Sequence, residues 1–459
     1  MQLPEKFIEK YQRLLGDEAP TFLASFDQPS QSGFRVNPLK AAPQATIDQA
    51  AGKVPYVPTG YYGGVDGKSL DHVTGAIYSQ EPSAMYVGEV VDPQPGERVL
   101  DLCAAPGGKT THLVAKMHDQ GLLVANEIFR KRAKVLAENL ERWGTTSTVV
   151  MNESPADLEE QFSQFFDRIL VDAPCSGEGM FRKEPAGIEY WSPDYPAECA
   201  NRQRKILASA IKMLKPGGIL VYSTCTFAPE EDEQNLAWLL QNYPDLKTVP
   251  VKKYPGMDDG RPEWADNNPA IRDAVRLFPH HIKGEGHFIA KLQNGDLVSV
   301  EAAAPAKRHR NKKKRRQQRP SLDKQDQAEF AAVRDVLLPD YQPNRLVTFG
   351  DQLYALPKGM PADLAGMTIR RPGLHLGTFK KNRFEPALAW ALATDPAVCP
   401  RVLELSHDQW RQYVHGDVVT IDSPKQNGWY LLACDGHTTG FGKLVGTTIK
   451  NFYPKGLRF

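Results

Sequence analysis

The sequence lacks the features that mark membrane and secreted proteins. None of its 459 residues lies in an uninterrupted apolar run of the roughly 18 residues that a membrane helix needs. The first twenty residues carry acids throughout and have no basic flank followed by an apolar stretch, so no secretory signal is expected. We therefore expect a cytoplasmic protein without a membrane span.

Cysteine is scarce and widely spaced. The six cysteines form no C-x-x-C pair and no tight group with histidine, so the sequence predicts neither a disulfide framework nor a metal site. A buried cysteine is most often an inert small apolar side chain, and this is our interpretation of the thiols of Cys103, Cys199, Cys399 and Cys434.

Positive and negative charges are nearly equal in number, but the positive charges are concentrated in one segment. The net charge is +1, although nine of the thirteen residues from Lys307 to Arg319 are basic, which leaves the rest at 47 minus 55, or −8. We interpret 294–325 as a basic linker that neutralises phosphates and binds less tightly as salt rises. The alternative is a solvated tether without a ligand.

The chain is longer than a single hydrophobic core supports, so two or three domains are expected. From Glu97 onward, strand-like and helix-like segments alternate as in a parallel sheet wrapped by helices, which is an α/β architecture. The expected strands are 98–105, 121–128, 147–152, 167–174, 218–225 and 286–292. The expected helices are 109–117, 130–144, 197–214 (closed by KPGG) and 230–243.

Beyond the linker, a helix is expected at 326–337. Short strand-like runs punctuated by Gly and Pro follow it, which predicts a compact and mostly β region.

A glycine-rich turn from Asp101 to Thr110, DLCAAPGGKT, follows the first expected strand, and Glu127 ends the second. Small residues let the backbone approach a ligand there, and an acid at the second strand tip can accept hydrogen bonds from ribose hydroxyls. The pair favours an adenosine cofactor. The alternative is a merely tight turn with a surface acid. The spacing does not fit G-x-G-x-x-G, which argues against a nicotinamide oxidoreductase.

Two cysteines stand at the tips of neighbouring expected strands. Asp172, Pro174 and Cys175 follow the fourth strand in DAPCSGEG, and Cys225 follows the fifth in YSTCTF. Ligands of such sheets bind outside the carboxyl ends of the strands, so both thiols should face one crevice.

These motifs resemble the RNA cytosine-5 methyltransferases of the NOL1/NOP2/Sun family, within it the bacterial ribosomal RNA subgroup RsmF. The other matching segments are RVNPLK (35–40), GAIYSQEPSAM (75–85), ANEIFRKRAKVLAENLERWG, YSTCTFAPEEDE and RLFPHHIKGEGHF. The resemblance implies an N-terminal RNA-binding α+β subdomain at 1–75 and a Rossmann-like class I methyltransferase domain at 76–293. It also implies an intermediate domain at 326–385 and a mostly β, PUA-like RNA-binding domain at 386–459.

The resemblance also implies roles for individual residues. Cys225 is the expected nucleophile, Cys175 assists product release, and Asp172 with Pro174 binds the target base. The residues expected to hold S-adenosyl-L-methionine are Cys103, Ala104, Ala105, Pro106, Gly107, Gly108, Lys109, Glu127, Arg132, Glu153 and Asp172. At Glu153, the segment MNESPAD departs from the family's usual aspartate. In a rival assignment Cys175 attacks, as in DNA cytosine methyltransferases, but those enzymes lack the second Thr224–Cys225 site.

The chemistry agrees with these roles, because carbon 5 of cytosine becomes nucleophilic enough for methylation only after a thiolate adds to carbon 6. The target must be single-stranded or flipped out, and Tyr78, Phe181 and Trp191 are candidates to stack on it or to be core. The expected partner of the chain, a monomer by default, is small-subunit ribosomal RNA or the subunit itself. The alternatives are transfer RNA, or a non-catalytic RNA-binding assembly factor.

Overall fold

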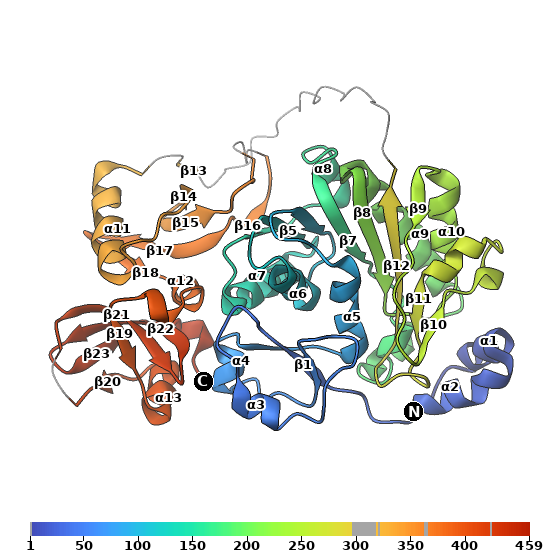
Figure 1. Cartoon of the computed structure of the whole chain (residues 1–459), viewed down its shortest axis with the longest axis horizontal. Helices are drawn as coiled ribbons and strands as arrows, with labels where there is room; N and C mark the ends of the chain where they lie inside the picture. The colour runs from blue at the N-terminus through green and yellow to red at the C-terminus, as the bar shows by residue number, and fades with distance from the viewer. Residues whose placement is uncertain (1, 296–317, 320–321, 362–365, 423–424) are drawn as a thin grey trace.

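The computed structural model describes residues 2–295, 318–319, 322–361, 366–422 and 425–459 (Figure 1). Most of the expected linker at 294–325, including the basic residues from Lys307 to Arg316, lies outside the described residues. No helix in the described ranges combines the length and the apolar character needed to cross a membrane.

A ten-stranded sheet forms the centre of the molecule, in the order β10-β11-β12-β8-β7-β4-β5-β6-β16, with β9 paired to β12. Its strands are β4 (Arg98–Asp101), β5 (Leu122–Asn126), β6 (Thr148–Met151), β7 (Phe166–Asp172), β8 (Leu214–Thr224), β9 (Leu246–Thr248), β10 (Met257–Asp259), β11 (Val275–Leu277), β12 (His287–Asn294) and β16 (Ile369–Arg371). The run β8-β7-β4-β5-β6 is parallel, as expected for an α/β domain, and its carboxyl ends meet at one edge.

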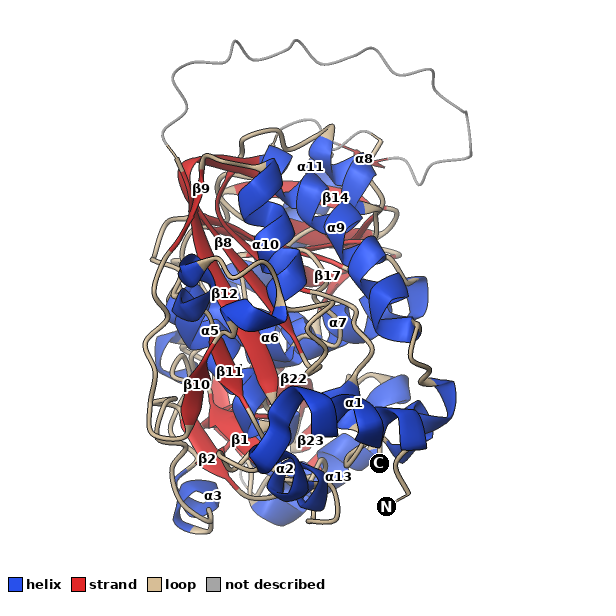
Figure 2. Ribbon diagram, turned by 90° about the vertical axis from the view of Figure 1, so that its right-hand side faces the viewer, coloured by secondary structure: helices blue, strands red, loops and turns tan. Residues whose placement is uncertain are grey.

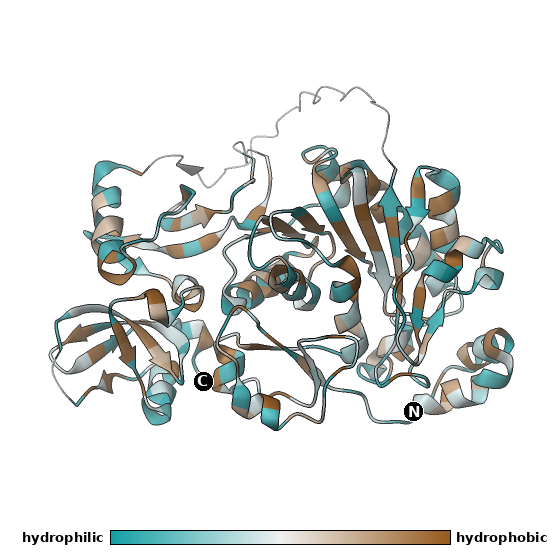
Figure 3. Ribbon diagram, in the orientation of Figure 1, coloured by the Kyte–Doolittle hydropathy of each residue, from teal (hydrophilic) through white to brown (hydrophobic). Residues whose placement is uncertain are grey.

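Both faces of this sheet are covered, because successive strand residues point to opposite sides. Leu100 and Val124 belong to one buried cluster, whereas their neighbours Val99 and Leu123 belong to another. Helices α8 (Pro155–Glu159), α9 (Tyr195–Met213) and α10 (Glu233–Asn242) contribute to the first cluster; α5 (Pro82–Val91), α6 (Gly108–Lys116) and α7 (Arg130–Trp143) contribute to the second. Figure 3 shows the apolar residues concentrated on the strands.

Two expected boundaries were wrong. The KPGG segment does not separate α9 from the next strand; it lies inside β8, where Phe166 pairs with Leu214 but Arg168 pairs with Ile219, so the extra residues form an irregularity of the ladder. Helix α10 begins at Glu233 rather than at 230, because Glu231 and Asp232 turn inward and make buried side-chain contacts.

The N-terminal region has two parts. A helical arm consists of α1 (Glu5–Leu15), the 3-10 turn η1 (Gly16–Glu18) and α2 (Ala19–Ser25). A small α+β unit follows, with α3 (Gln44–Asp48), α4 (Leu70–Val73) and the antiparallel strands β1 (Gly33–Val36), β2 (Gly60–Tyr62) and β3 (Ile77–Ser79). Figure 2 shows the arm at the end of the central sheet where β11 and β10 lie. Its aromatic residues Phe7, Tyr11 and Phe22 pack against Phe181 and Phe227 of the large domain.

The C-terminal region contains two five-stranded sheets, in the orders β13-β14-β15-β17-β18 and β19-β21-β22-β23-β20. The strands of the first are β13 (Gln318–Arg319), β14 (Arg345–Phe349), β15 (Gln352–Leu356), β17 (Leu374–Lys380) and β18 (Arg383–Pro386); those of the second are β19 (Val402–Glu404), β20 (Val419–Thr420), β21 (Gly428–Cys434), β22 (His437–Val445) and β23 (Thr448–Asn451). The helices are α11 (Lys324–Leu337), α12 (Leu388–Leu392) and α13 (His407–His415). The expectation of a mostly β region after an initial helix is confirmed.

One strand crosses from the C-terminal region into the central sheet. β16 pairs antiparallel with β6, with Ile369 opposite Met151. Arg371 anchors it: its guanidinium is 1% exposed and donates to the carbonyl oxygens of Thr148 at 2.7 Å and Thr145 at 2.6 Å. The central sheet is therefore completed by residues far from it in the sequence, beyond the expected linker.

Candidate active site

The two cysteines predicted to share a crevice lie side by side. β7 and β8 are parallel neighbours, with Asp172 opposite Ser223, so the loops that follow them start together. The Sγ atoms of Cys175 and Cys225 are 3.3 Å apart, which is a thiol–thiol contact and not a disulfide. Both side chains are partly exposed. A substrate atom can thus reach either sulfur.

Two buried acids fix the loops that carry these thiols. Glu231 accepts hydrogen bonds from the backbone N–H of Ser176 at 3.0 Å and from the Gln203 amide at 2.7 Å. Glu178 accepts from the backbone N–H of Phe227 at 3.2 Å and from the Tyr11 hydroxyl of the N-terminal arm. The loops also bind each other directly, since the Gly179 N–H donates to the Cys225 carbonyl at 2.9 Å.

A lysine–aspartate ion pair lies beside the thiols. The Nζ atom of Lys109 is 2.8 Å from Oδ2 of Asp172, and the Ser223 hydroxyl donates to the other carboxylate oxygen at 2.7 Å. Burial alone would lower the pKa of Lys109, but the charges of Asp172 and Cys225 outweigh it and the pKa is raised. The ammonium group therefore keeps its proton and supplies a fixed positive charge near Cys225.

The two thiols are not equivalent. The pKa of Cys175 is raised well above its usual value, first by its hydrogen bond with Cys225, then by burial and by the charge of Cys225. Cys175 thus holds its proton when Cys225 is a thiolate.

The glycine-rich turn lies at the carboxyl end of β4 as predicted. Gly107 has φ +117°, a conformation that favours glycine, and it caps the start of α6. The turn is held from α7, because Arg132 donates to the Ala105 carbonyl at 2.8 Å. Arg132 also forms an ion pair with Glu127 at 3.2 Å, and the buried Glu127 accepts from the Phe129 N–H at 2.8 Å.

Acids surround the pocket at this turn. Burial, and then the charges of Asp101, Asp172 and Glu127, raise the pKa of the Cys103 thiol, which agrees with its interpretation as an inert side chain. Burial also raises the pKa of Asp101 to about 7. One oxygen of Asp101 accepts from Thr110 at 2.7 Å, while the other is buried without a hydrogen bond among the described residues. The acidic surroundings of this turn therefore favour a ligand with a positive charge and a hydrogen-bond donor.

Glu153 occupies the tip of β6, at the far end of the same edge. Its backbone N–H donates to the Asn126 side chain at 3.1 Å, which places it beside Glu127. Its carboxylate accepts a hydrogen bond from the backbone N–H of Thr368, next to β16. The Glu153 carboxylate, expected from the resemblance to contact the cofactor, is thus already bound by a backbone N–H group of the C-terminal region.

The three candidates for stacking on the base are core residues. Tyr78 is 7% exposed, Phe181 1% and Trp191 8%. Phe181 and Trp191 pack in the aromatic cluster of the N-terminal arm, and the Trp191 indole donates to Glu178 at 2.9 Å. Of the two roles that the sequence left open for them, stacking or core, the structure favours the core. Among the other thiols, Cys199, Cys399 and Cys434 are buried, in line with structural roles.

Several functional contacts were missed from the sequence. Ser223 and Asp101 are polar residues at the carboxyl ends of their strands. Ligands of such sheets bind there, so both residues could have been predicted from the sequence. Glu231 and Glu178 could not, because they lie in loops and their partners come from other elements.

Comparison with known proteins decides the family. The model described as 16S rRNA methyltransferase RsmB/F matches residues 89–293, and models of the RsmF N-terminal, first C-terminal and PUA domains match 3–82, 329–394 and 400–459. The chain is 31% identical to Ribosomal RNA small subunit methyltransferase F of Cronobacter sakazakii, over 99% of this chain and 96% of that protein. It is 32% identical to the Aliivibrio fischeri protein of the same name, over 99% and 97%.

The chain belongs to the RsmF family of 16S rRNA methyltransferases. The resemblance inferred from the motifs is confirmed, as are the Rossmann-like fold and an rRNA methyltransferase activity.

Solved structures agree. A methyltransferase homolog from Pyrococcus horikoshii is 32% identical, with TM-score 0.56 over 63% of this chain and 95% of that one. NSun6 from Pyrococcus horikoshii, solved with SFG, has TM-score 0.56 at 22% identity over 63% and 98%, which shows a shared fold.

Proposed function

We propose that this RsmF family member transfers the methyl group of S-adenosyl-L-methionine to carbon 5 of a cytosine in small-subunit ribosomal RNA. In this proposal Cys225 attacks carbon 6 and Cys175 assists the release of the product. The observation that supports this proposal most directly is the pair of thiols, 3.3 Å apart, beside the Lys109–Asp172 ion pair. One thiol suffices for attack, and a second thiol in contact with it can assist the breakdown of the adduct.

The reaction needs the loss of one proton and one transient covalent bond to the protein. When the Cys225 thiolate adds to carbon 6, the electron pair of the 5,6 double bond makes carbon 5 nucleophilic. S-adenosyl-L-methionine, when bound, supplies the methyl group as a sulfonium electrophile. The proton on carbon 5 then passes to solvent water while the electron pair of its C–H bond re-forms the 5,6 double bond, and the bond between Sγ of Cys225 and carbon 6 breaks with Sγ leaving as a thiolate.

Charge at the site supports Cys225 as the nucleophile. The Lys109 ammonium stabilises a thiolate at Cys225, and the raised pKa of Cys175 keeps a proton on the second sulfur. Cys175 can thus donate a hydrogen bond to the attacking sulfur at the start and assist its departure as a thiolate at the end.

Asp172 is the proposed base-binding residue. Its two carboxylate oxygens are oriented by Lys109 and Ser223, so the group needs little reorganisation when a base arrives. Each oxygen retains a lone pair that can accept a hydrogen bond from the exocyclic amine of cytosine, or from its ring nitrogen when that nitrogen carries a proton. Pro174 beside it is exposed and available for contact.

The pocket at the glycine-rich turn fits the proposed cofactor. The free Asp101 oxygen and the acids around Cys103 complement a cationic ligand that carries an amine. Glu127 is positioned for the ribose hydroxyls, and residues 103–109 with Arg132 form the wall. Glu153 is proposed for the adenine side.

RNA binding is proposed for the regions that flank the catalytic domain, because phosphate contacts alone do not select one cytosine. The N-terminal unit at 1–75, the PUA-like domain at 386–459 and the intermediate domain at 326–385 are the candidates. The basic segment at 307–319 adds salt-dependent affinity in this proposal. We propose a cytoplasmic monomer.

The test is methyl transfer in vitro from a labelled donor to naked 16S rRNA, to assembled small subunits and to transfer RNA, followed by nucleoside mass spectrometry. We expect 5-methylcytidine in the ribosomal samples, and unchanged yield with Cys199→Ala, a matched buried-cysteine control. Methylation of transfer RNA alone would mean that transfer RNA, and not ribosomal RNA, is the substrate. RNA binding without any methylation would favour the assembly-factor alternative.

A further inference from the structure

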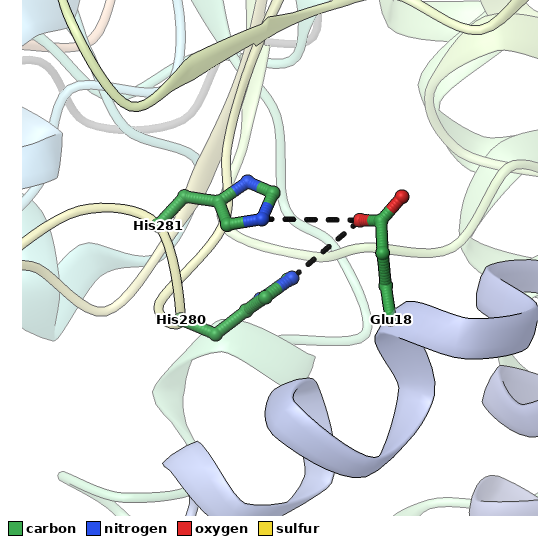
Figure 4. Close-up of side chains that lie close together, drawn as sticks. All are labelled: Glu18, His280 and His281. Carbon is green, nitrogen blue, oxygen red and sulfur yellow. Dashed lines mark ion pairs between the residues drawn. The ribbon is translucent and has the colours of Figure 1, made fainter.

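A cluster of two histidines and a glutamate connects the N-terminal arm to the catalytic domain. Glu18 ends η1, while His280 and His281 lie in the segment after β11 (Figure 4). One ligand atom from each of these residues lies within 4.8 Å of the others. The sequence could not reveal this group, because its halves are separated by most of the methyltransferase domain.

The three groups converge without forming hydrogen bonds to one another. Oε2 of Glu18 is 3.6 Å from Nε2 of His280 and 3.9 Å from Nε2 of His281, too far for a hydrogen bond. The His280 side chain is 3% exposed, and neither of its ring nitrogens makes a hydrogen bond within the described part of the chain. Two imidazoles and a carboxylate thus point at a common centre (Figure 4).

A further carboxylate orients one of the imidazoles. Nδ1 of His281 lies 2.8 Å from Oδ2 of Asp258 on β10. A proton on Nδ1 leaves the lone pair on Nε2, directed at the centre, and this carboxylate–histidine pairing is the usual second layer of a protein metal site.

We propose that Glu18, His280 and His281 form a binding site for a divalent transition-metal ion of the zinc class. Two imidazoles and one carboxylate are ligands that such ions accept, and these atoms are spaced as neighbouring ligands around one ion are. Glu18 and His281 are 42% and 32% exposed, so water can complete the coordination. Nη2 of Arg261 lies 3.3 Å from Oε1 and 3.2 Å from Oε2 of Glu18, so the guanidinium has to withdraw from Oε2, and can keep Oε1, when Oε2 binds the ion.

The bound ion clamps the helical arm to the catalytic domain. Tyr11 on that arm donates to Glu178, which in turn fixes the loop after β8 that carries Cys225. The metal therefore stabilises the arm at a distance from the reacting atoms, and the site does not depend on the proposed methylation mechanism.

The experiment is Zn²⁺ titration by calorimetry, with Co²⁺ absorption as a second readout. It uses the full-length chain carrying Cys175→Ser and Cys225→Ser, so that the catalytic thiols do not bind the ion. We expect one equivalent of Zn²⁺, with affinity reduced by at least roughly tenfold in Glu18→Gln and in His281→Gln, and by about tenfold in Asp258→Asn. His415→Gln is the matched control, because His415 also pairs with an aspartate but belongs to no such cluster among the described residues.

Three results overturn the proposal. One is the absence of Zn²⁺ binding to the parent chain. Another is equal affinity in the parent, Glu18→Gln and His281→Gln. The third is loss of the bound ion only in His407→Gln, which assigns it to the exposed group of His407, Cys434 and Asp435. Glu18 and His281 are partly exposed and glutamine preserves their bulk, and matching thermal melts without metal confirm that each variant is folded.

Discussion

The tips of β7 and β8 differ from the tip of β6 in how they are built, although all three lie at one edge of one sheet. At β7 and β8, every reactive group follows its strand directly, and Asp172, Cys175 and Cys225 converge because the strands are parallel neighbours. At β6, Glu153 is bound by the backbone of Thr368 from the C-terminal region. The reacting end is thus a local product of the α/β fold, whereas the other end depends on a contact between distant regions.

Because the reactive groups are concentrated at the tips of β7 and β8, we expect substitution of Cys225 to have the largest effect on the methylation rate. We expect Cys225→Ala to lower the methylation rate by at least about a thousandfold, because no other group supplies the covalent bond to carbon 6. Single-turnover kinetics with the rRNA substrate measure this. Retention of more than a tenth of the rate, with folding and cofactor affinity intact, would remove Cys225 from the role of nucleophile.

The next effect concerns the ion pair. Lys109→Met removes the positive charge beside Cys225 and releases Asp172, and we expect a loss of roughly a hundredfold in kcat. Lys116→Met is the control, since Lys116 lies on the same helix and pairs with Glu89, away from the thiols. Equal losses in both variants would point to damage to α6 rather than to the site.

The two thiols should also differ in chemical reactivity. Since the pKa of Cys175 is raised, its thiolate fraction at neutral pH is small, and each unit of difference in pKa changes that fraction tenfold. Iodoacetamide at pH 7 should therefore label Cys175 more slowly than Cys225, which lies near the Lys109 ammonium, and the labelling rate of Cys175 should rise with the pH. Peptide mass spectrometry gives both rates, and faster labelling of Cys175 would invert the assignment.

The contact between β16 and β6 should affect the stability of the fold more than the methylation rate. Arg371→Met removes a buried guanidinium that binds two carbonyl oxygens, and we expect unfolding free energy to fall by about 3 kcal/mol. Chemical denaturation measures this, with the exposed Arg383→Met as control. An unchanged midpoint would mean that the strand docks without this anchor.

The smallest effect is expected at Thr368. Thr368→Pro removes the N–H that binds Glu153, and we expect cofactor affinity to fall by about fivefold, the equivalent of one modest hydrogen bond. Thr368→Ala keeps the N–H and serves as the control. If both variants bind the cofactor like the parent, Glu153 takes no part in the adenine side of the pocket.

Sequence reasoning reached the parts of this molecule that are local. The order of β4 to β8, the turn at Gly107 and the convergence of Cys175 with Cys225 follow from short motifs and from the geometry of parallel strands. It missed what depends on tertiary pairing. Nothing in the residues around Ile369 shows that this strand leaves its own domain, and the buried contacts of Glu231 appear only once its partners are placed.

The same limit explains why the sequence left the roles of three aromatic residues open. Tyr78, Phe181 and Trp191 are aromatic residues near motifs, and sequence alone does not distinguish a stacking platform from a core position. The N-terminal arm decides the matter, because it covers Phe181 and Trp191 with its own aromatic rings.

The central claim is the order in which the two thiols act, and the adducts trapped in cysteine variants test it most directly. The parent, Cys175→Ala and Cys225→Ala are incubated with methyl donor and small-subunit rRNA, then denatured and resolved to detect RNA attached to protein. We predict that Cys175→Ala accumulates a denaturation-resistant adduct while Cys225→Ala forms none. An adduct that appears only in Cys225→Ala would contradict the account and make Cys175 the nucleophile.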